Sequence, residues 1–184
     1  SIPPTAPAAV GSEVVEPGAS GLKLSPIEAV QAYAAAKDDP AGESAELFDT
    51  ALADGSDRDP ARELWTTLVE HFEQPLATLA GGRHAASSRL VEGSVTALAT
   101  ADSGALVFGQ VRSVLEASFE PVEGLSIGFQ EESYTGLGAA TLTMTKSARI
   151  EHMQTVVLAV PPADSEDPIR VIAVADVPTA VEVE

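Results

Sequence analysis

The residues best suited to acid–base chemistry are three histidines, one of which lies where a functional loop is expected. His84 follows two glycines between the predicted helices and the predicted sheet, and loops at such junctions often carry function. With Glu92 or Glu151 as its partner, this histidine would abstract a proton or support a dehydration near neutral pH. An exposed loop histidine without a role is the common alternative. We therefore treat His84, Glu92 and Glu151 as candidates only.

Acidic residues with oxygen ligands for a hard cation form a second candidate site. Asp54, Asp57 and Asp59 lie in the segment ADGSDRDP, and calcium binds oxygen ligands at alternating positions of a loop. The segment lacks the glycine at the sixth position and the glutamate at the twelfth position of a helix–loop–helix calcium site. Turn formation and capping of the next helix explain the same residues. Calcium is therefore an alternative, and we predict no cofactor.

Tyr134 is a third candidate because it stands in the polar segment EESYTG, where no apolar periodicity requires a large ring. It would contact a ligand or partner, or cover a pocket as a lid.

The sequence has no motif of a serine hydrolase, a zinc protease, a phosphate-binding loop or a dinucleotide-binding turn. It also has no cysteine, which excludes disulfides and thiolate chemistry.

Charge and composition exclude further classes of function. The 184 residues suffice for one domain with a core, since 45% are hydrophobic, although only 4% are aromatic. Twenty-eight acidic residues against ten basic ones give a formal charge of -18. Such a charge repels phosphate backbones and anionic lipid surfaces. We therefore expect no nucleic-acid partner and no direct binding to a membrane surface.

The first twenty residues have the composition of a spacer. They are rich in Pro, Ala, Ser and Gly, which gives an extended chain that need not pack. No segment approaches the roughly 20 apolar residues of a membrane span, and the N-terminal residues do not resemble a signal peptide. We predict a flexible spacer over residues 1–20 and a single domain over residues 21–184, tethered by an anchor upstream of this sequence. A frayed terminus is the alternative.

Helices are predicted over residues 25–82. Ser25 and Glu28 form a capping box with a proline between them, so a helix begins there and runs to about Lys37. Apolar residues at helical spacing predict a second helix over residues 43–53. A third helix begins with Asp59 as its cap and has a wide apolar stripe, and Pro75 should break or kink it.

Strands are predicted over residues 88–178. Residues 90–119 read as a hairpin whose three-residue turn is Asp102, Ser103 and Gly104, with Gly104 at positive φ and Ala99 opposite Val107. Apolar alternation or apolar runs predict further strands over residues 125–130, 139–147, 153–160 and 169–177. Helices followed by strands with short turns give an α+β class, with N-terminal helices packed on an antiparallel sheet of five or six strands.

This order of elements is similar to cystatin-like and nuclear-transport-factor-like α+β folds, whose curved sheet often holds a pocket. In addition, TADSGALVFGQV at residues 100–111 and VVLAVPPADSEDPIRVIAVAD at residues 156–176 resemble segments of uncharacterised extracytoplasmic domains in actinobacterial lipoproteins and membrane proteins. The resemblance implies a location in the cell envelope, secreted or anchored to a membrane. It implies no activity for any residue.

Two classes of function remain. The first is a non-catalytic interaction or scaffold domain, tethered to the cell envelope, whose partner is an envelope protein. The second is a small-molecule-binding or lyase-like (hydrolyase) enzyme with a pocket in the concave face of the sheet. Because no catalytic spacing is recognisable, we favour the first class.

Overall fold

The protein has an α+β fold, as the sequence predicts, in a computed structural model that describes residues 13–49, 59–129 and 142–184. Its helices are α1 (Pro26–Asp38), α2 (Glu43–Glu46) and α3 (Pro60–Leu76). Its strands are β1 (Val14–Val15), β2 (Arg83–Leu90), β3 (Thr96–Ala99), β4 (Ala105–Ser118), β5 (Ile127–Phe129), β6 (Leu142–Met144), β7 (Ser147–Val160) and β8 (Arg170–Val183).

The start of α1 confirms the predicted capping box. The Ser25 side chain accepts a hydrogen bond from the backbone N–H of Glu28, and the Glu28 carboxylate accepts one from the backbone N–H of Ser25. This reciprocal pair satisfies two N–H groups that the first turn of a helix leaves without partners. The Ser25 hydroxyl also donates to the Glu28 carboxylate, and this hydrogen bond, followed by the one from the Ser25 backbone N–H, lowers the pKa of the Glu28 carboxyl.

The two later helices differ from their predicted lengths. The predicted helix over residues 43–53 ends after Glu46, because the chain then binds the backbone of Ile169 on both sides, through the carbonyl of Leu47 and the N–H of Asp49. Residues 50–58 lie outside the part of the chain described. In α3, Pro75 falls within the last turn and the helix continues to Leu76.

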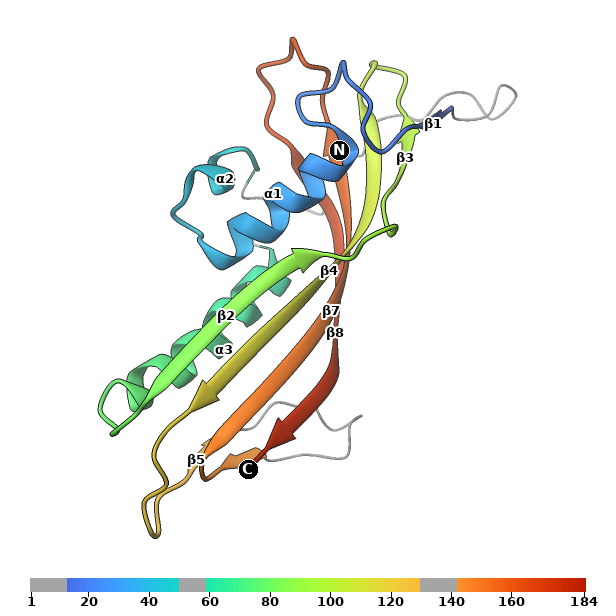
Figure 1. The fold of residues 1–184 in the computed structure, drawn as a ribbon. Coiled ribbons are helices and arrows are strands. Elements are labelled where there is room, and N and C mark those ends of the chain that lie inside the picture. The colour runs from blue at the N-terminus through green and yellow to red at the C-terminus, as the bar shows by residue number, and fades with distance from the viewer. Residues whose placement is uncertain (1–12, 50–58, 130–141) are drawn as a thin grey trace.

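The strands form one curved antiparallel sheet in the order β1-β3-β4-β7-β8, with β2 also paired to β4 (Figure 1). All strand pairs in this sheet are antiparallel. The long strands β4, β7 and β8 run the length of the sheet. After the short N-terminal strand β1, the strands extend from Arg83 to Val183, beyond the predicted bounds of 88 and 178. The short strands β5 and β6 pair separately.

The hairpin of β3 and β4 keeps the predicted faces but has a different register. Ala99 pairs with Ala105 instead of Val107, so the loop holds the five residues 100–104 rather than three. A shift of two residues returns every side chain to its own face, because side chains alternate with a period of two. The apolar pattern therefore predicts the faces correctly without fixing the register.

The turn itself corrects the expected role of glycine. The positive φ falls on Ser103, at 65°, and not on Gly104. Gly104 is required because a Cβ there would lie 2.7 Å from the carbonyl oxygen of Val160 on the neighbouring strand. Close approach of two backbones, rather than a left-handed conformation, is what selects glycine at this position.

The predicted first strand of the hairpin is in fact two strands. Strand β2 pairs with the C-terminal part of β4, and its last residue Leu90 lies opposite Val111. Strand β3 pairs with the N-terminal part of β4, and its first residue Thr96 lies opposite Phe108. Residues 91–95 form the break between them. One long strand, β4, thus holds both segments in one sheet.

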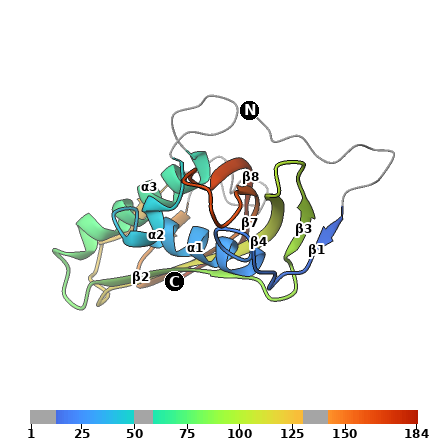
Figure 2. The ribbon, with the colours of Figure 1, turned by 90° about the horizontal axis from the view of Figure 1, so that it is seen from above.

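The helices cover one face of the sheet (Figures 1 and 2). Two apolar clusters lie between the layers. Residues of α1, including Val30 and Tyr33, pack with Val107 and Leu158, and residues of α3, including Phe72, pack with Ile150. No described helix covers the other face of the sheet, which we call the open face.

Packed structure begins before residue 21. Val14 and Val15 pair with Leu98 and Ala97, which adds β1 to the edge of the sheet, and the N–H of Ile27 donates to the carbonyl of Pro17. Residues 1–12 lie outside the described part, so a spacer role for them stays a prediction.

Candidate functional site

His84 lies within β2 and not in a junction loop. It pairs with Ala117, which is buried against α3, so alternation places the imidazole on the helix-covered side of the sheet. Glu151 lies between the core residues Ile150 and His152 and therefore points to the open face. Glu92 is exposed in the break after β2. The structure does not bring these three candidates together.

A different group of polar residues meets at the helix–sheet interface, and Lys37 is at its centre. Its side chain is only 1% exposed. The ammonium donates to Ser113 Oγ at 2.6 Å and lies 4.3 Å from the ring centre of Trp65. Burial lowers the Lys37 pKa to about 8, although Asp176, Asp38 and Asp59 favour the charged form.

The sheet side of this group is a histidine–aspartate pair. His152 Nδ1 lies 3.0 Å from Asp176 Oδ2, and its ring contacts the Trp65 ring edge to face at 6.0 Å. Gln154, directly opposite Asp176, is fully buried. Neither amide atom of Gln154, nor Trp65 Nε1, nor Asp176 Oδ1 has a hydrogen-bond partner within the described residues. Such atoms cost about 1–3 kcal/mol each, so they need an explanation.

Asp59, one of the calcium candidates, belongs to the buried group as well. The Tyr33 hydroxyl donates to Asp59 Oδ2 at 2.7 Å, and Asp59 Oδ1 accepts from the N–H of Arg62 in the first turn of α3. Burial and then the Asp59 charge hold the pKa of Tyr33 well above its usual value. Asp54 and Asp57 lie outside the described residues, and so does Tyr134.

No cluster of His, Asp or Glu side chains suited to a metal ion occurs among the residues that the structure describes. We call the group formed by Tyr33, Lys37, Asp59, Trp65, Ser113, His152, Gln154 and Asp176 the buried polar group. It lies between the two apolar clusters, at the junction of α1, α3 and three strands.

Sequence reasoning missed this group, although a signal was present. Along β7, His152 and Gln154 occupy the same alternating positions as Ile150, Val156 and Leu158, so two polar residues fall on the core side. Polar residues at core positions have to find partners there.

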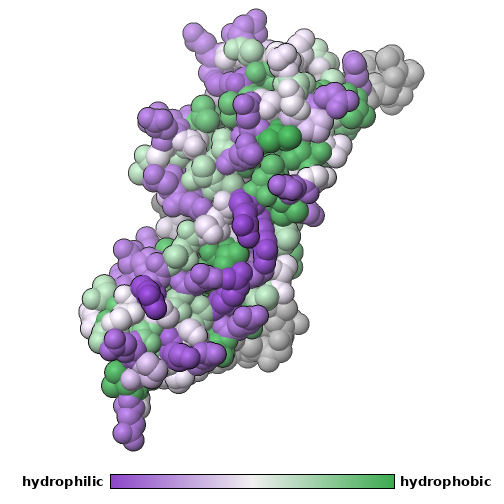
Figure 3. Space-filling model, viewed as in Figure 1, coloured by the Kyte–Doolittle hydropathy of each residue, from purple (hydrophilic) through white to green (hydrophobic). Residues whose placement is uncertain are grey.

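The open face carries the second polar arrangement. Glu151 accepts from Arg112 at 2.5 Å and from Arg149 at 2.7 Å, and Arg149 also pairs with Glu116. The hydrogen bond from Arg112 and then that from Arg149 lower the pKa of Glu151. Figure 3 shows hydrophilic and hydrophobic side chains side by side on this side of the molecule.

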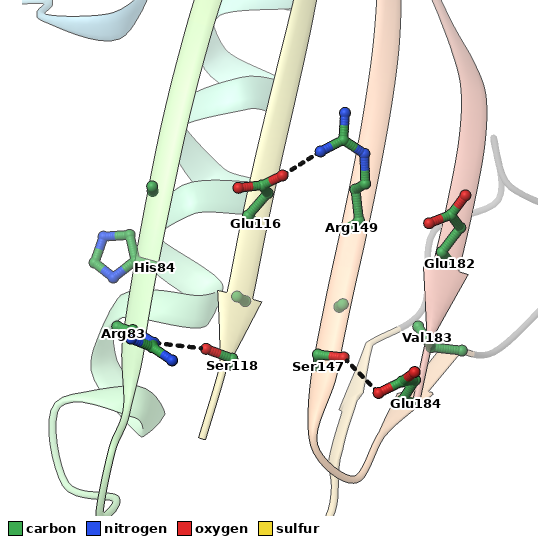
Figure 4. A pocket seen from close by; sticks show the side chains of 12 residues that line it. Arg83, His84, Glu116, Ser118, Ser147, Arg149, Glu182, Val183 and Glu184 are labelled. Atoms are coloured by element: carbon green, nitrogen blue, oxygen red, sulfur yellow. Dashed lines mark hydrogen bonds and ion pairs between the residues drawn. The ribbon is translucent and has the colours of Figure 1, made fainter. Parts of the chain in front are cut away.

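A shallow cavity of about 420 Å³ lies at the end of the same face, between β2, β4, β7 and β8 (Figure 4). Arg83, Glu116, Arg149 and Glu182 line it. His84 borders it from the outer strand, but Figure 4 shows the imidazole beyond the outer edge of β2, away from Glu116. The cavity therefore presents fixed charges of both signs rather than an acid–base pair.

Comparison of the chain with protein-family models, with curated proteins and with solved structures finds no match. The predicted resemblance to extracytoplasmic domains therefore stays a prediction. Within the described residues, no helix is both long and apolar enough to cross a membrane.

Proposed function

We propose that this chain is a non-catalytic interaction domain that binds its partner with the end of the open face that carries the charged residues. We call this surface the lower face and define it by four strand segments, Arg83–Arg89, Arg112–Ser118, Ser147–Met153 and Val177–Glu184. The ion pairs of this surface, which no described helix covers, are the observation that carries the proposal. The location of the protein in the cell envelope is part of the proposal and rests on the sequence resemblance alone.

Preorganised arginines make the lower face suitable for binding. The side chains of Arg112 and Arg149 are each 36% exposed and share the carboxylate of Glu151, which is 13% exposed. Arginine is enriched in protein interfaces, and a side chain held in place before binding loses less conformational entropy on binding. Two guanidinium groups are therefore fixed in orientation yet still accessible.

The groups best suited to acid–base catalysis are placed unfavourably for a reaction with a substrate. Lys37 and His152 are each 1% exposed, and both bind other side chains of the core. A catalytic acid or base has to come within hydrogen-bond reach of its substrate. This placement supports a structural role for the buried polar group.

Carbodiimide-driven labelling of carboxyl groups tests the proposal in the cells that naturally make the protein. Glu116 and Glu182 on the lower face should be labelled in the dilute purified protein and protected in cells. Glu70 and Glu73 on α3 are also exposed and serve as matched controls, whose labelling should not change. Equal labelling of Glu116 and Glu182 in the two conditions would refute the proposed binding surface.

A second candidate function, binding of a small polar molecule within the buried polar group, is favoured by one observation. The amide of Gln154, the Trp65 indole N–H and Asp176 Oδ1 have no partners among the described residues. A bound molecule that donates and accepts hydrogen bonds would satisfy them. Replacement of Gln154 by leucine distinguishes the two cases, because it should destabilise a protein in which the amide has a bound partner and stabilise one in which it has none.

A further inference from the structure

We propose that the partner of the lower face is a second copy of this chain, bound face to face about a two-fold axis that runs along the strands between β4 and β7. The inference rests on the proposed function and identifies its partner. It follows from how charges are arranged across the strands.

Two rows of side chains cross the lower face at right angles to the strands, as Figure 4 shows. Strand register fixes the members of each row, in the order β2, β4, β7, β8. The last row is Arg83, Ser118, Ser147 and Glu184, and the row above it is Ala85, Glu116, Arg149 and Glu182.

A two-fold axis along the strands exchanges β4 with β7 and β2 with β8. Every row keeps its position along the strands, so each row lies over the same row of the partner. Glu116 then lies over the partner's Arg149, and Arg149 lies over the partner's Glu116. Arg83 lies over the partner's Glu184 in the last row. Each of these contacts joins opposite charges and occurs twice in the dimer, so the two rows are self-complementary, as a two-fold interface requires.

The row of Arg89, Arg112, Met153 and Val177 adds apolar contact. Under the same axis, Arg112 lies over the partner's Met153 and Arg89 lies over the partner's Val177. Val177 is 56% exposed, one of few large apolar side chains exposed in the described chain. Apolar stems of arginine cover such side chains while their charged ends stay in water.

A two-fold axis across the strands, through the middle of the lower face, is opposed by charge. It would lay each strand on its own copy in the reverse direction. Arg83 would then lie over the partner's Arg89, and β2 has no acidic residue to compensate. Like charges in direct apposition destabilise an interface, so the arrangement of charges favours the axis along the strands over this alternative.

The lower face is large enough for a weak dimer. Four strands at about 4.8 Å spacing and about seven residues at about 3.3 Å rise cover roughly 450 Å² per copy. Two copies would bury roughly 900 Å², which is the size of a weak, transient interface. The formal charge of -18 on each copy opposes association at long range, and salt near 0.15 M screens this repulsion beyond about 8 Å.

Sedimentation velocity of the full chain in 0.15 M NaCl at micromolar to submillimolar concentrations tests the dimer. The wild type should dimerise. Glu116→Arg and Arg149→Glu should each weaken self-association at least tenfold, because each variant places like charges at both central contacts. An equimolar mixture of the two variants should dimerise again, since every central contact in the mixed dimer joins opposite charges.

Lys23→Glu, which changes the net charge as Arg149→Glu does but lies away from the sheet face, is the matched control and should dimerise like the wild type. Melting curves show whether each variant is folded. A monomeric wild type over the whole concentration range, or a dimer that neither variant weakens, would overturn this inference. In either case, carboxyl protection of the lower face in cells would still support the proposed function, with another protein as the partner.

Discussion

Replacement of Lys37 by methionine is the sharpest test of the buried polar group. Methionine keeps the length and most of the apolar stem and removes the charge. The Lys37 pKa is about 8 in the folded protein and about 10.4 in an unfolded chain. Below pH 8 both states bind the proton, and the cost of burying the charge is fully present. Between these pKa values the unfolded state binds more protons, so stability rises with pH.

The size of the effect follows from the two pKa values. Integration of the proton linkage from pH 7 to pH 9.5 gives a gain of about 2 kcal/mol for the wild type. The methionine variant lacks this contribution. Tyr33 and all other groups are common to both proteins, so the difference between them isolates Lys37.

Urea unfolding of both proteins at pH 7, 8, 9 and 9.5 measures this difference. The free energy of unfolding of the wild type minus that of Lys37→Met should rise by about 2 kcal/mol across the series. A difference that stays constant within about 0.5 kcal/mol would show that Lys37 keeps an ordinary pKa, and would refute its burial among these groups.

Three further substitutions test local features by urea unfolding at pH 7. Gln154→Leu should raise the free energy of unfolding by about 1–2 kcal/mol, because it removes two buried polar atoms without partners; a loss of more than about 1 kcal/mol would mean that the amide has a bound partner. Ser25→Ala should lower stability by about 1 kcal/mol through loss of the capping box, and no loss would contradict that role. Gly104→Ala should cost about 2 kcal/mol, since its Cβ would clash with a carbonyl oxygen; unchanged stability would rule out this clash.

The fold class was predictable because local signals agree with the tertiary structure. The capping box at Ser25 and Glu28 starts α1 where the sequence places it. Alternation gave the correct faces of β4, but the pairing of Ala99 with Ala105 depends on the contacts of the turn, which an apolar pattern does not specify. The early end of α2 depends on Ile169, more than one hundred residues away in the chain.

The candidate site was less predictable, for a physical reason. Lys37 lies at the end of a helix and reads as a surface residue, and only the packing of Trp65 and Ser113 around it makes it a buried one. Glu151 was predicted as a possible catalytic partner, but strand register places it between Arg112 and Arg149. Contacts across strands and between layers, and not local sequence, decide which polar residues meet.

Photo-crosslinking at Val177 tests the central claim, binding through the lower face, most directly. A photoreactive residue replaces Val177 on the lower face or, as a control, Gln31, which is exposed on α1. Irradiation in the cells that make the protein should give a defined adduct from position 177 and none from position 31. An adduct of twice the mass of the chain would identify a second copy, and any other single mass would identify a different partner. Absence of an adduct from position 177, or equal adducts from both positions, would contradict the account.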